Sequence, residues 1–397
     1  KTNTIKHLIM KKSILKLFLV GAFSTLALTS CSNNDDNGVE ETNPSGFVAN
    51  PADFKGQLKS GDKITLDASK TYYLTGALQV NEGATLTIPA GTKIIANGGT
   101  SSYIAVAQGG QIFSNGTSSK PVVFTSEKGT PGSWGGIVLC GKAPINKAKS
   151  ATAEVSELTY GGDVATDNSG TITYTRIEYA GAIFNNKKEF NGLSLFGVGN
   201  GTKIEYVQLY AGSDDGIEFF GGTVNTKYIV SNENEDDQFD WTEGWVGTNE
   251  YWYGKEGRNK GNRGIEADNN DSNNNLTPFS NPIIKNVTLI GLGKDYVGEG
   301  ENQAIKLRQG TKGQLENFVL ANWAKGIDIE HDVTLGWTSK DLLVKNVQFI
   351  NVNTESSGKT SAGAAVDVTK FYSKANNTGA GNGVDTPTWA KGWTVGL

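Results

Sequence analysis

A repeat of 22 residues constrains this chain more than any other feature. The stretches Gly216–Gly222 (GIEFFGG) and Gln238–Gly244 (QFDWTEG) each follow a pair of aspartates, Asp214-Asp215 and Asp236-Asp237. Within each stretch, residues that would face a core alternate with residues that would face outward, as in a β-strand. A repeat of roughly 20–30 residues with strand patterning is typical of a solenoid. We therefore predict an all-β fold, a right-handed parallel β-helix in which one repeat forms one coil.

The same pattern recurs along the chain. Further strands of this first type are expected at 192–196, 264–268, 304–308 and 326–330, and strands of a second type at 172–177, 204–209, 284–289, 315–320 and 344–349. Asn or Tyr stands at the third position of the second type, where stacked side chains would pair along the solenoid. A sandwich of hairpins is the alternative all-β fold. The chain has few two-residue hairpin turns between adjacent strands, which argues against it.

The first 46 residues are not part of the predicted fold. Residues 1–9 read as translated sequence upstream of Met10, the single methionine. Residues 10–30 combine a basic start with an apolar run, which is the form of a secretory signal. That run is short of the ~20 residues that a transmembrane helix needs. Residues 31–46 are polar and predict a flexible tether, and residues 47–397 are expected to form a single β-helix domain.

Charge and cysteine content exclude several classes of function. Residues 1–30 contain five lysines and no acid, so the rest of the chain carries 31 basic and 41 acidic groups, a net charge of about −10. This argues against nucleic acid as a partner, because nucleic-acid binding needs a basic surface. Beyond Cys31 only Cys140 remains. It stands in the apolar run 137–140, where a buried and inert thiol is expected.

Several segments are predicted to depart from regular coils. Residues 47–75 are expected to form a cap or first turn over the open end of the solenoid, residues 147–168 to form an insertion, and the stretch 389–394 to close the C-terminal end. Two excursions, 247–262 and 268–282, are long enough to carry binding functions on a rigid scaffold. Residues 352–386 are rich in Gly, Ser, Thr and Asn and are predicted to loop out.

Aligning the strands of the first type predicts columns of outward-facing side chains. One column contains Ser194, Glu218, Asp240, Glu266, Lys306 and Asp328, and the next contains Phe196, Phe220, Thr242, Asp268, Arg308 and Glu330. Coils stack ~4.8 Å apart. The three neighbouring carboxylates of the first column would repel one another by about 1 kcal/mol per pair in water and about 3–4 kcal/mol at an effective dielectric constant of 20.

Three interpretations of these acids stay open. They form a solvated ladder that fixes the coil register, balanced by Lys306 and Arg308. They hold Ca²⁺, which prefers all-oxygen ligands, through Asp215, Asp237, Glu218 and Asp240. Or they are catalytic carboxylates, for which the candidates are Asp214, Asp215, Asp236, Asp237 and Asp240.

Aromatic residues follow the acids in the sequence. Trp241 stands at an inward position, whereas Trp245, Tyr251, Trp252 and Tyr253 lie on or beside the first predicted excursion. These four would either provide flat platforms for sugar rings, with Glu218, Glu266, Asp268 and Lys306 binding the ligand, or pack the excursion onto the solenoid.

Two motifs carry a resemblance to a known family. Leu28–Cys31 (LTSC) matches the bacterial lipobox, and an acidic segment follows it. The run from Trp134 to Asn146 (WGGIVLCGKAPIN) belongs to coils that resemble those of β-helix surface lipoproteins of the Bacteroidota. The resemblance implies lipidation at Cys31, an anchor in the outer membrane and exposure at the cell surface. It implies location and fold more than activity.

The predicted shape also resembles that of the pectin-degrading β-helix enzymes. Their hydrolases use aspartates from adjacent coils, and Ala304–Lys306 is faintly similar to their R-I-K motif. Their N-T-D and G-H-G motifs are missing, and His331 is expected to be a surface residue. The related lyases use Ca²⁺ and an arginine base, for which Arg308 is the candidate. As an alternative, Arg308 is a salt-bridged surface residue.

We therefore predict a surface-tethered protein that binds an extended ligand, such as a glycan, on the outer face of a β-helix, with Ca²⁺ as a candidate cofactor. One alternative is a polysaccharide lyase or glycoside hydrolase that acts on acidic glycans. Another is an accessory scaffold of an outer-membrane transporter.

Overall fold

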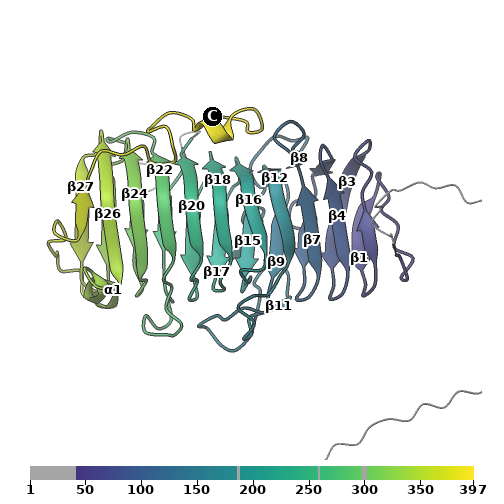
Figure 1. Ribbon diagram of the computed structural model, residues 1–397, viewed down its shortest axis with the longest axis horizontal. Helices are drawn as coiled ribbons and strands as arrows, with labels where there is room; N and C mark the ends of the chain where they lie inside the picture. Colours follow the sequence, from purple (N-terminus) through teal and green to yellow (C-terminus); the bar gives the residue numbers. More distant parts are fainter. Residues whose placement is uncertain (1–41, 186–187, 258–259, 297–301) are drawn as a thin grey trace, which may run out of the picture. The chain divides into compact units, whose positions relative to one another are not determined.

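The computed structural model describes residues 42–397 except 186–187, 258–259 and 297–301. The predicted lipidation site Cys31, the signal segment and most of the tether lie outside the described residues. Twenty-four of the described strands are joined by parallel pairing into one continuous right-handed β-helix, so the predicted fold is confirmed. Figure 1 shows the coils stacked along the long axis of this domain. In the described part of the chain, no helix is both long enough and apolar enough to cross a membrane.

Three parallel ladders run along the solenoid. Ladder 1 consists of β1 (Phe54–Leu58), the second half of β3 (Thr71–Val80), β6 (Ile104–Val106), β9 (Ile137–Cys140), β15 (Leu193–Phe196), β17 (Ile217–Phe220), β19 (Phe239–Thr242), β21 (Arg263–Ala267), β23 (Gln303–Leu307), β25 (Lys325–Glu330) and β27 (Thr354–Lys359). Ile217 pairs with Phe239 and Phe219 with Trp241, which is the register that the 22-residue repeat predicts.

The other two ladders share seven long strands that bend in the middle. Ladder 2 contains β2 (Lys63–Thr65), β4 (Thr85–Pro89), β7 (Gln111–Asn115) and the first halves of β12 (Gly170–Glu178), β16 (Lys203–Tyr210), β18 (Asn225–Asn232), β20 (Thr248–Lys255), β22 (Ile283–Ile290), β24 (Gly313–Ala321) and β26 (Leu342–Ile350). Ladder 3 contains the first half of β3, β5 (Lys93–Ala96), β8 (Val122–Thr125), the second halves of those seven strands and β28 (Tyr372–Lys374).

The bend lies at the third position of the strands of the second type. Tyr174, Tyr206, Tyr228, Tyr251, Asn286, Asn317 and Asn346 all have positive φ there. The four tyrosine rings stack on one another with centroids 4.3–5.0 Å apart. The three asparagines form a hydrogen-bonded ladder, in which Asn317 donates to Asn286 at 3.0 Å and Asn346 donates to Asn317 at 3.1 Å. The predicted stacking is therefore confirmed.

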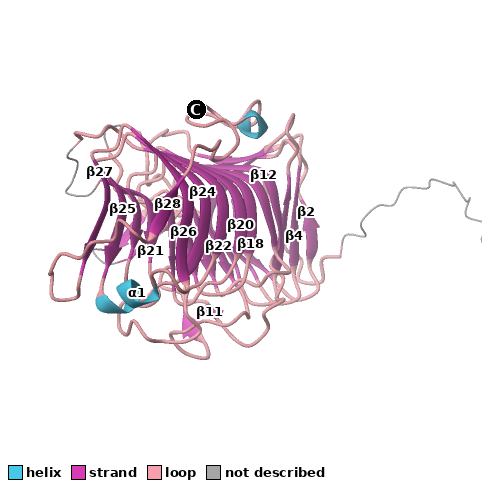
Figure 2. Cartoon of the chain, turned by 60° about the vertical axis from the view of Figure 1, so that its left-hand side comes forward, coloured by secondary structure: helices cyan, strands magenta, loops and turns pink. Residues whose placement is uncertain are grey.

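Apolar side chains from all three ladders fill the interior, which is lined by residues such as Ile217, Phe219, Trp241, Ile265 and Ile305 with no exposed surface. A second apolar cluster lies outside ladder 1. There the predicted insertion, which carries the hairpin β10 (Ala151–Thr152)–β11 (Thr159–Tyr160), packs Tyr160 onto Phe196 and Phe220. Figure 2 shows this hairpin and the short helix α1 (Asp332–Trp337) on the same side of the solenoid.

Three segment predictions were wrong. Residues 248–255 are not an excursion but β20. Asn249 and Trp252 are buried and pair in register with residues of β18. Residues 352–386 contain β27 and β28, which extend the ladders instead of looping out. The C-terminal residues, with a short 3₁₀ helix at Thr388–Ala390, do not close the end of the solenoid. They run back along it, so that Trp393 contacts Tyr174 and Tyr206.

Candidate functional site

A column of charged side chains runs along the outer face of ladder 1. Glu218 of β17 stands beside Asp240 of β19, which stands beside Glu266 of β21. The column continues with Lys306 and Asp328. All of these residues alternate with buried core residues, so their side chains point away from the interior. The register predicted from the sequence is confirmed for the whole column.

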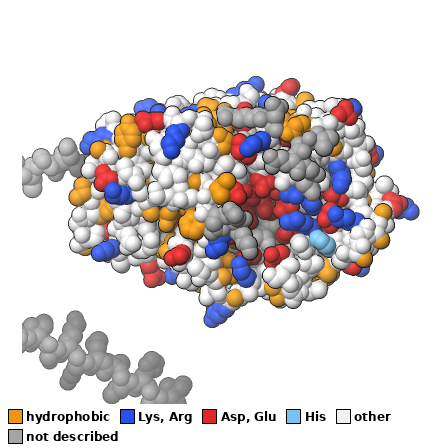
Figure 3. All heavy atoms as spheres, turned by 180° about the vertical axis from the view of Figure 1, so that it is seen from behind, with side chains coloured by type: hydrophobic (Ala, Val, Ile, Leu, Met, Phe, Trp, Pro, Cys, Tyr) orange, Lys and Arg blue, Asp and Glu red, His pale blue; other side chains and the backbone are white. Residues whose placement is uncertain are grey.

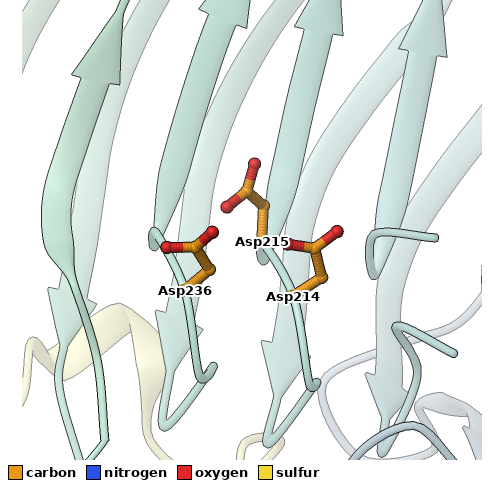
Figure 4. A group of neighbouring side chains, drawn as sticks. All are labelled: Asp214, Asp215 and Asp236. Carbon is orange, nitrogen blue, oxygen red and sulfur yellow. The ribbon is translucent and has the colours of Figure 1, made fainter. Parts of the chain in front are cut away.

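A further column lies where the chain turns into ladder 1, two residues before β17 and β19 and at the first residue of β21. Asp215 and Asp237 occupy successive coils, and the Asp237 amide donates to Asp215 Oδ1 at 2.9 Å. Arg263 follows them in the column, because its carbonyl accepts the Gln238 amide just as the Asp237 carbonyl accepts the Gly216 amide. Asp214 and Asp236 lie one residue earlier still. Figure 4 shows the carboxyl groups of Asp214 and Asp236 on adjacent coils, with that of Asp215 nearby.

Seven carboxylates from these columns form one continuous group, called here the acidic cluster: Asp214, Asp215, Glu218, Asp236, Asp237, Asp240 and Glu266. In each of three overlapping triads, one oxygen per residue lies within 4.8 Å of the others. The triads are Asp214–Asp215–Asp236, Asp215–Glu218–Asp240 and Asp237–Asp240–Glu266. In Figure 3, acidic side chains gather near the middle of this face with Lys and Arg side chains beside them.

The cluster is more buried than a solvated ladder would be. Asp215 is 6% exposed and Asp237 is 2% exposed. The insertion covers the neighbouring Phe196 and Phe220. The hairpin β13 (Ile183–Asn185)–β14 (Lys188–Glu189) and the turns that follow β20 and β22 surround the cavity beside the acids. The acidic cluster is therefore only partly solvated, and burial makes mutual repulsion among the carboxylates stronger.

Two arginines neutralise one end of the cluster. Arg263 contacts Asp237 at 3.2 Å and Glu266 at 2.9 Å. Arg308 contacts Glu266 at 2.7 Å and Asp268 at 2.8 Å. These are charge-assisted contacts of the stronger kind. At the other end Asp214, Asp215, Glu218, Asp236 and Asp240 form no ion pair within the described part of the chain.

The carboxyl pKa values reflect this imbalance. Burial, followed by the charges of neighbouring carboxylates, raises the pKa of Asp215, Glu218 and Asp240 well above the ordinary range. The pKa of Asp214 is raised by burial and then by Asp236 and Glu189. For Glu266 burial also raises the pKa, although Arg263 and Arg308 oppose it. A bound cation would remove the same repulsion that protonation removes.

Several buried oxygens in this region accept no hydrogen bond from the described residues. They are Oδ1 of Asp237, Oδ1 of Asp240 and Oδ1 of Asn191, which is 3% exposed. The Asn191 amide nitrogen donates to Glu218 Oε2 at 2.7 Å, so this side chain belongs to the same site. Unsatisfied buried oxygens are costly, and oxygen-only donors are the set that Ca²⁺ prefers. The residues present therefore fit a divalent cation.

The predicted lyase base is held in ion pairs. Burial lowers the pKa of Arg308, but Asp268 and Glu266 outweigh burial and raise it. A guanidinium fixed between two carboxylates is poorly suited to accept a proton. Lys306 lies 3.7 Å from Glu330 on the neighbouring coil and is 5% exposed, and His331 accepts the Gln309 amide through Nδ1 at 3.1 Å. Lys306 and Arg308 both lie beside Glu266 of the acidic cluster, as the column alignment predicts.

The prediction of an exposed aromatic platform for sugar rings was wrong. Trp245 and Trp252 are fully buried in the core, where both stack on Phe219, and Tyr253 is 2% exposed beneath the C-terminal residues. Tyr251 belongs to the tyrosine stack at the bend between ladders 2 and 3, not to ladder 1. Tyr251, Trp252 and Tyr253 belong to β20, and the error at these positions came from treating residues 248–255 as a loop. The inward position of Trp241 and the buried thiol of Cys140 are confirmed, and burial raises the pKa of that thiol to about 12.

Two residues of the site were missed from the sequence. Asn191 and Arg263 each precede the glycine that opens a strand of the first type, as Asp215 does before Gly216. Extending the column alignment by one residue toward the N-terminus places Asn191, Asp215, Asp237 and Arg263 together. That signal was present in the repeat.

Comparison with known proteins supports the fold. A family model described as a pectate-lyase-like β-helix domain matches residues 56–394. No curated protein matches the sequence. Among solved structures, a double mutant of the periplasmic alginate epimerase AlgG is similar over 80% of this chain and 83% of its own, with 13% identity and a TM-score of 0.34. The unmutated AlgG structure is similar over 75% of this chain and 84% of its own, with 11% identity and a TM-score of 0.28.

Proposed function

Because the chain belongs to the pectate-lyase-like β-helix domain family, we propose that it binds an extended glycan along the outer face of ladder 1, with Ca²⁺ held by the acidic cluster. One observation carries this proposal. Five buried or half-buried carboxylates converge without an ion pair from the described residues, and buried oxygens of Asn191, Asp237 and Asp240 lack hydrogen-bond donors there.

The triad Asp215–Glu218–Asp240 is the best place for the cation. Its members form no ion pair with Arg263 or Arg308 within the described part of the chain, and Asn191 contacts it through Glu218. Ca²⁺ takes six to eight oxygen ligands, more than this triad offers. Hydroxyl or carboxylate oxygens of a glycan would complete the coordination sphere, so that the cation links protein and ligand.

The chain would act at the cell surface. The lipobox that ends at Cys31 and the acidic tether support a lipid anchor in the outer membrane. Metabolic labelling with palmitate should label the full chain and not a Cys31→Ala variant, and protease treatment of intact cells should remove the labelled domain. A partnership with an outer-membrane transporter would appear as co-purification from membranes.

A glycan array followed by calorimetry tests the binding function. We expect the full chain to bind a glycan in Ca²⁺ and at least ~10-fold more weakly after chelation, a difference of ~1.4 kcal/mol. Asp240→Asn should weaken Ca²⁺-dependent binding, whereas the matched control Glu316→Gln on ladder 2 should not. Binding that is indifferent to both Ca²⁺ and Asp240→Asn would contradict the proposal.

The family description favours one second candidate, a polysaccharide lyase or glycoside hydrolase. In such an enzyme the acidic cluster would supply carboxylates from adjacent coils. It predicts new reducing ends or unsaturated products from acidic glycans, lost in Asp237→Asn and Asp240→Asn. The ion pairs of Arg308 argue against a lyase that uses this residue as its base. Glycan binding without any product would retire the enzymatic candidate.

A further inference from the structure

A cavity of about 290 Å³ opens beside the acidic cluster. Asp214 and Asp236 line it from the turns before β17 and β19, and Glu189 lines it from the hairpin β13–β14. Ile183 and Tyr296 contribute apolar surface to its wall. The cavity therefore combines an acidic floor with a smaller apolar side.

The charges of this lining are unbalanced. Lys260, the basic residue among the lining side chains, contacts Glu235 at 2.9 Å. Glu189, Asp214 and Asp236 form no ion pair within the described part of the chain. The three groups thus repel one another across the cavity and would repel an anionic sugar as well.

Two features of this cavity indicate an organic ligand and not a bare metal ion. The volume is close to the ~300 Å³ lower limit of small-molecule sites, far more than one ion needs. In addition, Ile183 is 60% exposed and the adjacent Phe184 is 48% exposed, on the hairpin that borders the cavity. Large exposed apolar side chains beside polar groups mark a contact surface for an organic ligand.

An unsatisfied buried acid lies directly behind the same wall. Glu256 is 5% exposed, and neither carboxyl oxygen makes a hydrogen bond of normal geometry within the described part of the chain. A Cβ atom on Gly261, which lines the cavity, would lie 1.5 Å from Glu256 Oε2. Gly261 therefore lets Glu256 approach the wall of the cavity closely.

We propose that this cavity is a subsite for one sugar residue with a free, protonated amine, an amino sugar, within the glycan that ladder 1 binds. The inference rests on the proposed glycan-binding function. The ammonium group would lie between Glu189, Asp214 and Asp236, and the apolar face of the ring would pack on Ile183. An amine suits this cavity better than a uronate carboxylate, which would meet Glu189, Asp214 and Asp236, while Lys260 in the described lining already contacts Glu235.

Calorimetry on the chelator-treated full chain tests the subsite, with a β-1,4-linked glucosamine tetramer and its fully N-acetylated counterpart in 150 mM salt. We expect the free-amine oligomer to bind at least ~10-fold more tightly. Glu189→Gln should lower affinity for the free-amine oligomer only, whereas Ile183→Ser should lower affinity for both. Glu205→Gln, at a half-buried acid on ladder 2 that contacts Lys203, is the matched control for non-specific attraction and should change neither.

Equal affinity for the two oligomers, no binding of either, or a loss in Glu205→Gln equal to that in Glu189→Gln would overturn the subsite. The proposed function fails separately: the amine preference is measured without Ca²⁺, whereas Ca²⁺-dependent binding is measured with Asp240→Asn. A preserved amine preference without any effect of Ca²⁺ would support the subsite and contradict the proposed Ca²⁺ site.

Discussion

Asp240 is the residue at which the acidic cluster most clearly lowers the stability of the folded chain. Its carboxyl group belongs to two of the three triads, and its Oδ1 is buried without a hydrogen bond from the described residues. Glu218 and Glu266 are its neighbours in the column. Two like charges at about 4 Å repel by about 1 kcal/mol in water and about 4 kcal/mol at an effective dielectric constant of 20. Without a cation this position destabilises the fold.

Asp240→Asn should therefore stabilise the chelated protein and abolish the benefit of Ca²⁺. We expect a gain of about 1 kcal/mol in the free energy of unfolding without Ca²⁺, measured by chemical denaturation. Wild type should gain stability on adding Ca²⁺ and the variant should not. A loss of stability in the chelated variant would show that Asp240 is held by favourable contacts.

The pH dependence of stability has a definite sign. The pKa values of Asp215, Glu218 and Asp240 are raised in the folded chain. The folded state therefore binds more protons than the unfolded state above the ordinary carboxyl range near pH 4. The contribution of these groups is fully present below that range and is lost as the pH rises through the raised values.

Denaturation midpoints of the chelated protein at pH 4.5, 6 and 7.5 test this sign. The difference in denaturation midpoint between Asp240→Asn and wild type should grow with pH. Because the two proteins differ only at this residue, the difference reports on the acidic cluster and not on the rest of the chain. Saturating Ca²⁺ should flatten the trend in wild type. A difference that is constant across these pH values would contradict the raised pKa of Asp240.

At the scale of elements, the long strands depend on the residue at the bend. Asn317 has φ of 63° and makes two hydrogen bonds, one to each neighbouring coil. Asn tolerates this left-handed conformation better than most residues, so the same side chain satisfies the backbone and joins three coils. Tyr174 to Tyr251 serve the equivalent role through ring stacking.

Asn317→Ala should cost about 1–3 kcal/mol, because it strains the bend and leaves two partners unsatisfied. Asn317→Gly should cost less, since glycine adopts positive φ readily and only the hydrogen bonds are lost. Denaturation of both variants separates the two contributions. Equal costs would show that the bend itself is unstrained.

At the scale of the whole molecule, the repeat was sufficient to predict the architecture and most of the site. Because side chains two dozen residues apart become neighbours in a solenoid, aligning Glu218, Asp240 and Glu266 placed them correctly. The burial of the site was not predictable in this way. It depends on the insertion and on the hairpin at Ile183–Glu189, which belong to no repeat and whose packing follows from long-range contacts.

The C-terminal residues illustrate the same limit. Gln208 accepts the Val395 amide at 3.0 Å and donates to its carbonyl at 2.6 Å, and Trp389 packs on Tyr228. Nothing in the local sequence shows that these residues fold back over ladder 3. Removing residues 377–397 should expose Val230 and Tyr253, lower the midpoint of thermal unfolding and increase binding of an apolar dye. Val384→Ser, at an exposed position, is the control and should change neither.

Calorimetry shows whether the acidic cluster binds a divalent cation. Ca²⁺ is titrated into the chelator-treated full chain at pH 7 by calorimetry, in two buffers with different heats of ionisation. We predict binding accompanied by proton release, because the cation displaces protons from carboxyls with raised pKa values, and we predict its loss in Asp240→Asn. Absence of binding, or binding that Asp240→Asn leaves unchanged, would contradict a cation site in the acidic cluster.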